Sequence, residues 1–288
     1  MKNKPTVTIG ISAYNEEANI GHLLRSLQNE VIRTVRVVKI IVVSDGSTDS
    51  TVSIVKNTKN SKTLLINQRQ RIGLHKSQNR IIRMTGSDIL VLLDADTIPL
   101  KGFIDAICRP IIKSRQVGIV GAETVPAEPH NLLEQIIVDA RELKISIYEK
   151  LRQGSNIYLC HGRARAFSKT IYSKIKWPVI CPEDSYSYLF CIARGFRFVY
   201  EPHAVVRYRT PSRLGEYIEK SSRFFSGKNM LRHFFKKDFV NEQYAIPKLL
   251  FISSVLLFLI KKPFSTLAFI ALFLSVRVVW GWRYTYRP

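Results

Sequence analysis

The segment 89–96 combines an apolar run with two acids, and it restricts the possible fold more than any other feature of the chain. Ile89 to Leu93 is long and apolar enough for a buried strand, and Asp94 and Asp96 follow directly. A buried carboxylate is costly unless it is paired or binds a metal, and ligands bind α/β sheets at the carboxyl ends of strands. The segment therefore predicts a site for Mg²⁺ or Mn²⁺ and a diphosphate, because these cations prefer oxygen ligands. An exposed turn after the strand is the alternative.

Segments typical of strands alternate with segments typical of helices along the first part of the chain. The strand-like segments are rich in β-branched residues, and the segments between them repeat apolar residues at helical spacing. We expect strands at 6–13, 37–43, 63–67 and 89–94, and helices at 15–28, 50–56 and 75–84. This order predicts an α/β fold with a Rossmann-like, mostly parallel sheet flanked by helices.

A second acidic turn follows the strand expected at 37–43. Residues 44–49 read Ser-Asp-Gly-Ser-Thr-Asp and lead into the next expected helix. Residues 47–49 are good helix caps, so we give them a structural role. Asp45 stands at the strand end, where its carboxylate can accept hydrogen bonds from a base or a ribose. We therefore predict that Asp45 contacts a nucleoside.

Two adjacent acids, Glu183 and Asp184, open another segment with helical spacing. The helix dipole favours acids in the first turn, so we interpret Glu183 as structural. The second carboxylate is free to face a cleft, where it can serve as a general base.

The net charge of +22 is concentrated in the second half of the chain. Residues 1–140 hold 18 lysines and arginines against 13 acids, and residues 141–288 hold 26 against 9. This excess implies an anionic partner, which can be a nucleic acid, a phosphorylated substrate or an anionic membrane face. The start of the chain does not resemble a signal peptide, and the cysteines show no C-x-x-C pairing, so we expect reduced thiols and a catalytic domain on the cytosolic side. The cysteines are Cys108, Cys160, Cys181 and Cys191.

Two apolar segments near the C-terminus favour the membrane as the anionic partner. Residues 245–260 and 264–282 contain one basic residue each, and Lys261-Lys262-Pro263 separates them. Each segment spans about 25 Å as a helix, which is marginally short for the hydrocarbon core. We prefer a hydrophobic helical hairpin that spans the membrane; a re-entrant or interfacial pair and a buried hairpin of a soluble domain are the alternatives. We expect a catalytic domain at 1–238 and membrane-associated helices at 245–284.

The acidic blocks together resemble those of family 2 of the inverting glycosyltransferases, which have the GT-A fold and use nucleotide sugars. The resemblance covers about residues 6–227. It rests on four blocks in the family's order, Ile11–Glu17, Val42–Asp49, Leu93–Pro99 and Glu183-Asp184. The resemblance implies nucleotide contacts from Ala13, Tyr14, Glu16, Asp45 and Asp94. It also implies that Asp94 and Asp96 bind a divalent cation (Mg²⁺ or Mn²⁺) and that Asp184 is the catalytic base.

Three arginines lie where the chain departs from the family's pattern. Arg163 belongs to the block 161–167 that precedes the acid pair, and Arg207 stands where a histidine often follows the last strand. Arg223 lies in a degenerate form of the Q-x-x-R-W block of membrane-bound synthases. Because guanidinium groups bind phosphates well, we consider Arg163, Arg207 and Arg223 as contacts for a phosphate or the acceptor.

These features predict a membrane-associated inverting glycosyltransferase with a nucleotide-sugar donor, preferably a UDP-sugar. The acceptor is expected to be lipid-linked or a saccharide near the membrane, as in the synthesis of cell-envelope polysaccharides or glycolipids, and no nucleic acid is expected as a partner. One alternative is a nucleotidyltransferase on a similar fold, which predicts a basic, glycine-rich phosphate loop where this chain has Glu16 and Glu17. The other is a non-catalytic, basic, membrane-tethered binding protein, which has no need for the acidic blocks.

Overall fold

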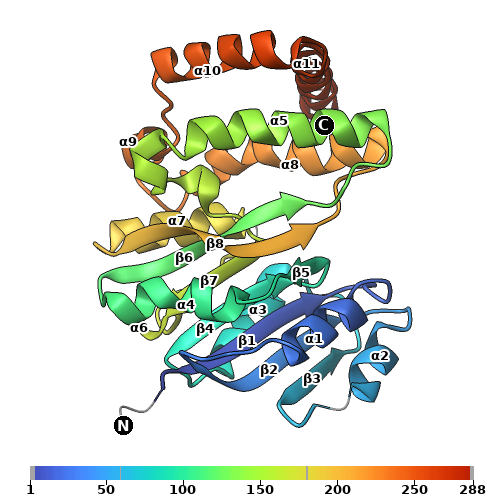
Figure 1. Ribbon diagram of the computed structural model, residues 1–288, viewed down its shortest axis with the longest axis vertical. Helices are drawn as coiled ribbons and strands as arrows, with labels where there is room; N and C mark the ends of the chain where they lie inside the picture. Colours follow the sequence, from blue (N-terminus) through green and yellow to red (C-terminus); the bar gives the residue numbers. More distant parts are fainter. Residues whose placement is uncertain (1–3, 59, 180, 286–288) are drawn as a thin grey trace. The chain divides into compact units, whose positions relative to one another are not determined.

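The computed structural model describes residues 4–58, 60–179 and 181–285, and the chain divides into two compact units. The first unit consists of residues 1–125 and 157–208, and the second of residues 126–156 and 209–288. Within the described residues, the sheet belongs to the first unit and the second unit is helical (Figure 1). From the sequence we expected a boundary at residue 238 instead, between a catalytic domain and membrane-associated helices. That boundary concerns membrane association, which the packing does not test, and it stays a prediction.

The first unit is built on one sheet, whose described strands run in the order β3-β2-β1-β4-β7-β6-β8-β5. The neighbours from β3 to β4 are parallel, whereas β7 is antiparallel to β4 and β6, and β5 is antiparallel to β8. The predicted α/β class is therefore confirmed, with an antiparallel half added to the Rossmann-like half. The strands are β1 (Thr6–Ala13), β2 (Arg36–Asp45), β3 (Thr63–Gln68), β4 (Ile89–Asp94), β5 (Thr97–Pro99), β6 (Val117–Pro126), β7 (Ala164–Ser168) and β8 (Arg197–Tyr208).

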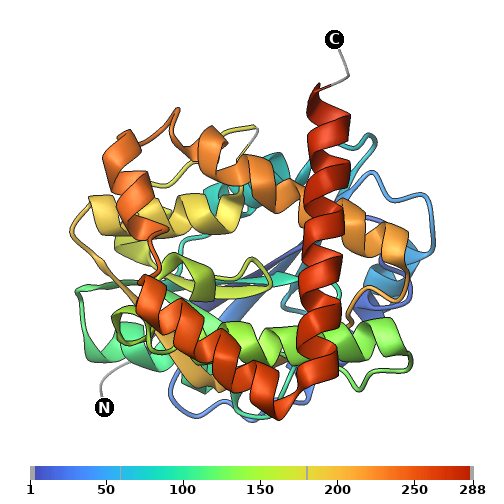
Figure 2. The ribbon, with the colours of Figure 1, turned by 90° about the horizontal axis from the view of Figure 1, so that it is seen from above.

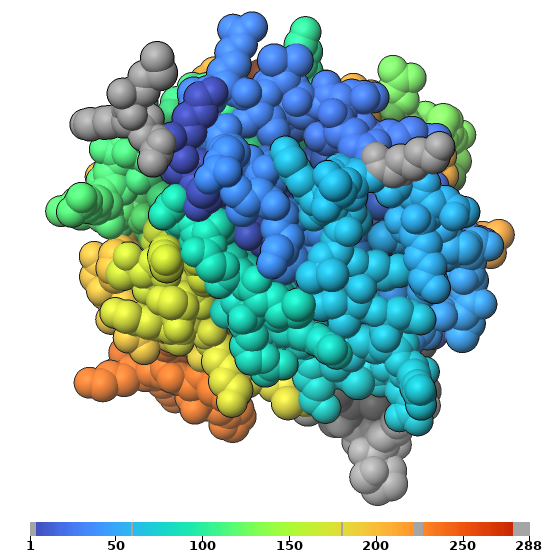
Figure 3. Space-filling model, turned by 90° about the horizontal axis from the view of Figure 1, so that it is seen from below, coloured from blue at the N-terminus to red at the C-terminus, as the bar shows by residue number. Residues whose placement is uncertain are grey.

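Helices alternate with the strands of the first unit along the chain, and they pack against the sheet. Apolar side chains of α1 at positions 20, 23, 24 and 27 are buried with alternate residues of β1 and β4, because one helix face and one sheet face must exclude water together. The surface of α3 (cyan to teal) adjoins that of the segment preceding α7 (yellow), as Figure 3 shows. The helices are α1 (Ile20–Gln28), α2 (Thr51–Asn57), α3 (Leu74–Arg83), α4 (Phe103–Lys113), η2 (Ile157–Leu159), α6 (Lys169–Tyr172) and α7 (Glu183–Ala193).

The first helix begins later than the sequence spacing predicts. Residues 15–19 were expected to be helical, but α1 starts at Ile20. Asn15 has φ of 54°, and its side-chain oxygen accepts a hydrogen bond from the Thr48 amide at 2.8 Å. The Glu17 carboxylate likewise accepts from the Ser50 amide at 2.9 Å. The polar residues of this segment therefore join the loops after β1 and β2 and are not available for a helical turn.

The second unit consists of helices that pack against one another. In this unit α11 contacts α5, α8 and α10, and α10 also contacts α5 (Figure 2). The chain turns between α10 and α11 at Lys262-Pro263, because a proline lacks the N–H of a continuing helix and restricts the residue before it. The described elements are α5 (Leu132–Tyr148), η1 (Leu151–Gly154), α8 (Leu214–Leu231), α9 (Lys237–Gln243), α10 (Lys248–Lys261) and α11 (Pro263–Thr285).

The predicted apolar helices near the C-terminus are present, and they expose much apolar surface. By length and composition, one segment of the described chain, Lys237–Lys261, is able to cross a membrane. This segment contains α9 and α10 with a non-helical stretch between them, and the 14 residues of α10 span only about 21 Å. Large apolar side chains that are at least half exposed include Leu249, Phe251, Ile252, Leu256, Leu257, Ile260, Phe264, Leu267, Leu274 and Val278.

Candidate active site

The carboxyl ends of three parallel strands meet at one edge of the sheet in the first unit. Ser12 of β1 is paired with Asp94 of β4, and Ala13 is paired with Ser44 of β2. Asp45 is the last residue of β2. The register therefore brings the three acidic or polar blocks predicted from the sequence to the same edge (Figure 1).

Asp94 ends β4, and Asp96 lies in the tight turn that follows. The Asp94 amide donates a hydrogen bond to the Arg163 carbonyl at 2.9 Å, and the Thr97 hydroxyl donates to the Asp94 carbonyl at 2.7 Å. Burial and the nearby Asp96 charge raise the pKa of the Asp94 carboxyl to about 6, and Asp184 acts in the same direction. The turn therefore holds a surplus of negative charge at the sheet edge.

Glu16 adds a further carboxylate to this edge. Burial raises its pKa, the charges of Asp96 and Asp94 act in the same direction, and the Asn19 amide donates to the Glu16 carboxylate at 2.7 Å. Within the described chain, no group of three His, Cys, Asp or Glu side chains is arranged to hold a metal ion. Asp94 and Asp96 nevertheless fit Mg²⁺ or Mn²⁺, because such cations bind through one or two carboxylates and complete their coordination with waters and substrate phosphates.

Asp45 organises the loop that follows β3. Its buried carboxylate accepts hydrogen bonds from the amides of Ile72 and Gly73 at 2.7 and 2.8 Å. Gly46 has φ of +72°, and a Cβ there would lie 2.6 Å from the Arg71 amide nitrogen, so a glycine is required after Asp45. The predicted nucleoside contact of Asp45 stays a prediction, and the structure adds a second role in shaping the loop.

Tyr14 and Arg71 form an exposed stacked pair beside Asp45. The Arg71 guanidinium carbon lies 4.0 Å from the centre of the Tyr14 ring, which is 37% exposed. A flat aromatic ring and a flat guanidinium are both suitable for stacking against a base. Arg71 was missed as a site residue because its loop is placed by Asp45, and only the tertiary structure brings it to Tyr14.

The acid pair opens α7 as predicted, and the environments of its two carboxyls differ. A Cβ on Gly162 would lie 2.8 Å from the Glu183 carboxylate, so Glu183 is closely packed against the backbone of that glycine. Asp184 accepts a hydrogen bond from the Ser185 amide at 2.6 Å. Burial raises the pKa of Glu183, and the neighbouring Asp184 and Asp94 act in the same direction. The structure therefore brings both acids within electrostatic reach of Asp94.

Arg165 is a completely buried arginine behind these carboxylates, and the sequence reasoning did not select it. Its guanidinium donates to the Glu183 carbonyl at 3.1 Å and to the Ser187 hydroxyl at 2.9 Å. Its positive charge opposes the rise in the pKa of Asp94 and Glu183. The signal for Arg165 in the sequence is its place between two alanines in a central strand, where a buried arginine requires anionic neighbours.

The three arginines that were predicted from the sequence as phosphate or acceptor contacts lie in different surroundings. Arg163 stacks on Tyr208, with its guanidinium carbon 3.8 Å from the ring centre, and its charge opposes the rise in the pKa of Asp94. Arg207 is exposed and paired with Ile98 in the sheet, on the face of β8 opposite to Tyr208. Arg223 lies in α8, and its side chain is outside the described residues. Of the two whose side chains are described, Arg163 is the one whose charge acts on Asp94.

Replacing Gly162 with alanine should displace the Glu183 carboxylate and destabilise the fold by about 1 kcal/mol, the low end of the usual range for overpacking, because the conflicting atom is the end of a side chain. Chemical denaturation measures the loss. The matched control is Gly86→Ala, because a Cβ on Gly86 has no atom within 4 Å. In the double variant Gly162→Ala/Glu183→Ala, the steric conflict is absent, so most of its cost in unfolding free energy should be recovered. If the losses of the two single variants simply add in the double variant, close packing is not the cause.

Comparison with known proteins agrees with this geometry. The family model for glycosyl transferase family 2 matches residues 8–176. No curated protein matches the chain significantly. Among solved structures, the mannosyltransferase PcManGT from Pyrobaculum calidifontis, in complex with GDP-Man and Mn²⁺, is similar with a TM-score of 0.66 and 18% identity, covering 96% of this chain and 81% of that one.

Two further structures share the fold. S. aureus TarS, residues 1–349, has a TM-score of 0.61 and 14% identity, covering 86% of this chain and 71% of that one. Glucosyl-3-phosphoglycerate synthase from Mycobacterium tuberculosis, in complex with Mn²⁺, UDP and glucosyl-3-phosphoglycerate, has a TM-score of 0.55 and 20% identity, covering 80% of this chain and 79% of that one. With its acidic strand ends, its GT-A-like sheet and a family match over more than half its length, the chain belongs to glycosyl transferase family 2 and is a glycosyltransferase.

Proposed function

We propose that this enzyme is an inverting glycosyltransferase that moves a sugar from a UDP-sugar to a hydroxyl or phosphate group of an acceptor near a membrane. The observation that carries the proposal is that Asp96 and Asp184 both lie close enough to Asp94, the last residue of β4, for their charges to raise its pKa. A site of this kind can hold a leaving diphosphate through a cation and deprotonate an acceptor beside it. We favour UDP because the similar synthase from Mycobacterium tuberculosis was solved with UDP, and GDP is the alternative because PcManGT was solved with GDP-Man.

Each residue has a separate role in the proposed reaction. Asp94 and Asp96 would hold a divalent cation, which when bound supplies positive charge for the leaving diphosphate. Asp45 and Tyr14 would position the nucleoside. Asp184 would accept the proton of the attacking acceptor as general base. Attack from the side opposite to the leaving diphosphate inverts the configuration at the anomeric carbon.

A screen of nucleotide sugars tests this proposal. With Mn²⁺ and no added acceptor, we expect slow release of sugar from one UDP-sugar, and NMR of the first product should show the anomeric configuration opposite to that of the donor. The control is Asp96→Asn, which should abolish the metal-dependent release. A retained configuration would contradict inversion, release from GDP-sugars alone would correct the base, and release from no donor would contradict the proposed donor class.

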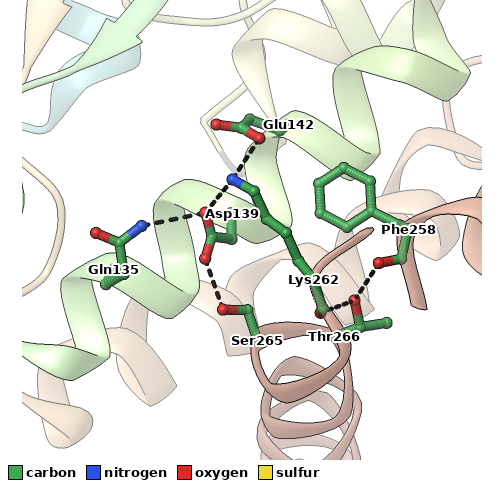
Figure 4. A network of polar contacts seen from close by, with 7 residues as sticks. All are labelled: Gln135, Asp139, Glu142, Phe258, Lys262, Ser265 and Thr266. Carbon is green, nitrogen blue, oxygen red and sulfur yellow. Dashed lines mark hydrogen bonds and ion pairs between the residues drawn. The ribbon is translucent and has the colours of Figure 1, made fainter. Parts of the chain in front are cut away.

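Contacts at the turn between α10 and α11 support a proposal for the mode of membrane association. The Lys262 ammonium donates to the carboxylates of Asp139 and Glu142 at 2.6 and 2.7 Å, and the Ser265 hydroxyl donates to Asp139 at 2.6 Å (Figure 4). Burial would raise the pKa of Asp139, but the hydrogen bonds from Lys262 and Ser265 outweigh it and lower that pKa. The turn is therefore attached to α5 by charged groups.

This attachment favours the interfacial alternative over the spanning hairpin that the sequence suggested. α5 carries five charged residues among its 17, so it is unsuitable for the hydrocarbon core. A spanning hairpin would carry Lys262 to the far side of the bilayer and leave Asp139, whose side chain is 6% exposed, without its cation. We therefore propose that α10 and α11 lie in the interface of one leaflet, with their exposed apolar side chains in the lipid.

Labelling at the turn distinguishes the two modes. We expect Lys261→Cys, in protein bound to the outside of sealed anionic vesicles, to react with a membrane-impermeant maleimide as completely as the control Lys113→Cys in the first unit. Both positions are exposed, and the four native cysteines are buried with raised thiol pKa values, so their background reaction is low. Protection of Lys261→Cys alone would support the spanning hairpin. Release of the full chain by salt would contradict hydrophobic insertion altogether.

A further inference from the structure

The first unit contains a pocket with a basic rim, separate from the carboxylates of the active site. It encloses about 350 Å³ between α3 and residues 176–179, whose surfaces lie side by side in Figure 3. Its lining includes the basic residues Lys76, Arg80, Arg83 and Lys176 and the apolar residues Trp177 and Val179. The pocket therefore combines apolar lining residues with four basic side chains.

The two walls of the pocket are held together by hydrogen bonds. The Asn79 side chain donates to the Trp177 carbonyl at 2.9 Å and accepts from the Trp177 amide at 3.0 Å. The His75 ring forms a further hydrogen bond with the Cys181 carbonyl at 2.6 Å. These contacts connect α3 with the segment before α7, so the pocket is preformed and need not be created by a ligand.

The charges around the pocket have no counter-charge in the described chain. Lys76, Arg80 and Arg83 follow the spacing i, i+4 and i+7, which places them on one face of α3, and Lys176 lies on the other wall. All four side chains are exposed, none forms a described ion pair, and no acid lines the pocket. Like charges at this spacing repel one another, and a bound anion would relieve that repulsion.

The walls of this pocket also hold two elements of the active site. The Ile72 amide, on one wall, donates to Asp45, and the Trp177 indole, on the other, donates to the Glu183 carbonyl at 3.0 Å. An anion bound here therefore lies against residues that support both the predicted nucleoside contact and the acid pair. Two arginines with planar guanidinium groups match phosphate oxygens, and the apolar lining residues suit a neighbouring uncharged group.

We infer that the pocket between α3 and residues 176–179 binds a phosphate-bearing group, which in the proposed function is the anionic group of the acceptor. This assignment of the ligand as part of the acceptor rests on the proposed glycosyl transfer. The pocket itself rests on the four unpaired cations, the joined walls and the volume.

Binding of inorganic tripolyphosphate to the full chain, measured by calorimetry in chelator, tests the pocket without the metal site. We expect the double variant Arg80→Ser/Lys176→Ser to bind about tenfold more weakly than the wild type, since two charge-assisted contacts are lost. The matched control is Lys113→Ser/Arg115→Ser, which removes the same charge from exposed positions outside the pocket. Equal weakening in the two double variants, or none in either, would overturn the inference.

Two further arms identify the source of the phosphate and separate this inference from the proposed function. Glycerol 3-phosphate represents a free phosphorylated acceptor, and phosphatidic acid in detergent micelles represents a lipid one. The source is the ligand for which the pocket variant loses affinity while its control variant keeps it. Loss in neither arm would overturn the assignment to an acceptor. Metal-dependent donor hydrolysis should be equal in the pocket variant and the wild type. If neither the wild type nor the pocket variant hydrolyses a donor, the proposed function is contradicted. The tripolyphosphate experiment then still shows whether the pocket binds an anion.

Discussion

Replacing Asp184 with asparagine is expected to lower turnover about a hundredfold or more and to leave donor affinity nearly unchanged, because general-base catalysis contributes at least that much. The amide has the size of the carboxylate but does not accept a proton at neutral pH. The Asp184 charge reaches Asp94, so a small change in cation affinity is expected as well. Single-turnover rates and donor binding, measured at saturating Mn²⁺, separate the two effects.

Glu183→Gln is the matched control for this prediction. Glu183 is packed against Gly162 and its pKa is raised by burial, so its substitution should act through packing and change stability more than turnover. If Glu183→Gln lowers turnover more than Asp184→Asn at equal donor affinity, Glu183 is the base. A histidine or water as the base would instead leave both variants active.

Removal of divalent cations is expected to abolish transfer, and Asp94→Asn or Asp96→Asn should do the same at any practical Mn²⁺ concentration. Burial is the main cause of the raised pKa of Asp94, and the Asp96 charge adds to it, so a cation between the two carboxylates would stabilise their ionised forms. Asp96→Asn should weaken donor binding only in the presence of metal, whereas Asp45→Ala should weaken nucleotide binding with or without it. Full turnover in excess chelator would contradict the role assigned to the two acids.

Thermal unfolding gives a second measure of the cation that does not depend on activity. The Asp94 pKa of about 6 exceeds its ordinary value near 4, so the native state binds an extra proton, and the stability that this proton provides is lost as the pH rises through 6. A cation at the ionised carboxylate replaces that proton. Mn²⁺ should therefore raise the melting temperature more at pH 7.5 than at pH 5, and Asp96→Asn should reduce this difference. An equal rise at both pH values would indicate binding elsewhere.

The local elements of the first unit were predictable because their patterns are determined by neighbours in the sequence. The apolar run from Ile89 to Leu93 is a buried strand, and Asp94 follows it at the sheet edge, as expected. Strand ends in a parallel sheet meet at one edge, and the register brings Ala13, Asp45 and Asp94 to that edge, whereas their nucleotide and metal contacts stay predictions. The predicted start of the first helix was wrong because the side chains of Asn15 and Glu17 bond to a loop that is distant in the sequence.

The sequence by itself determined the α/β class, the family and the placement of acids at strand ends, because strand periodicity, strand-end acids and block order are properties of short segments. Only the tertiary structure decided which groups surround those acids. Arg165 acquires its role because antiparallel pairing places it behind Glu183, and Lys262 acquires its role because the chain turns back onto Asp139. Electrostatic energies depend on distance and burial, which become defined only when segments distant in the sequence are packed together.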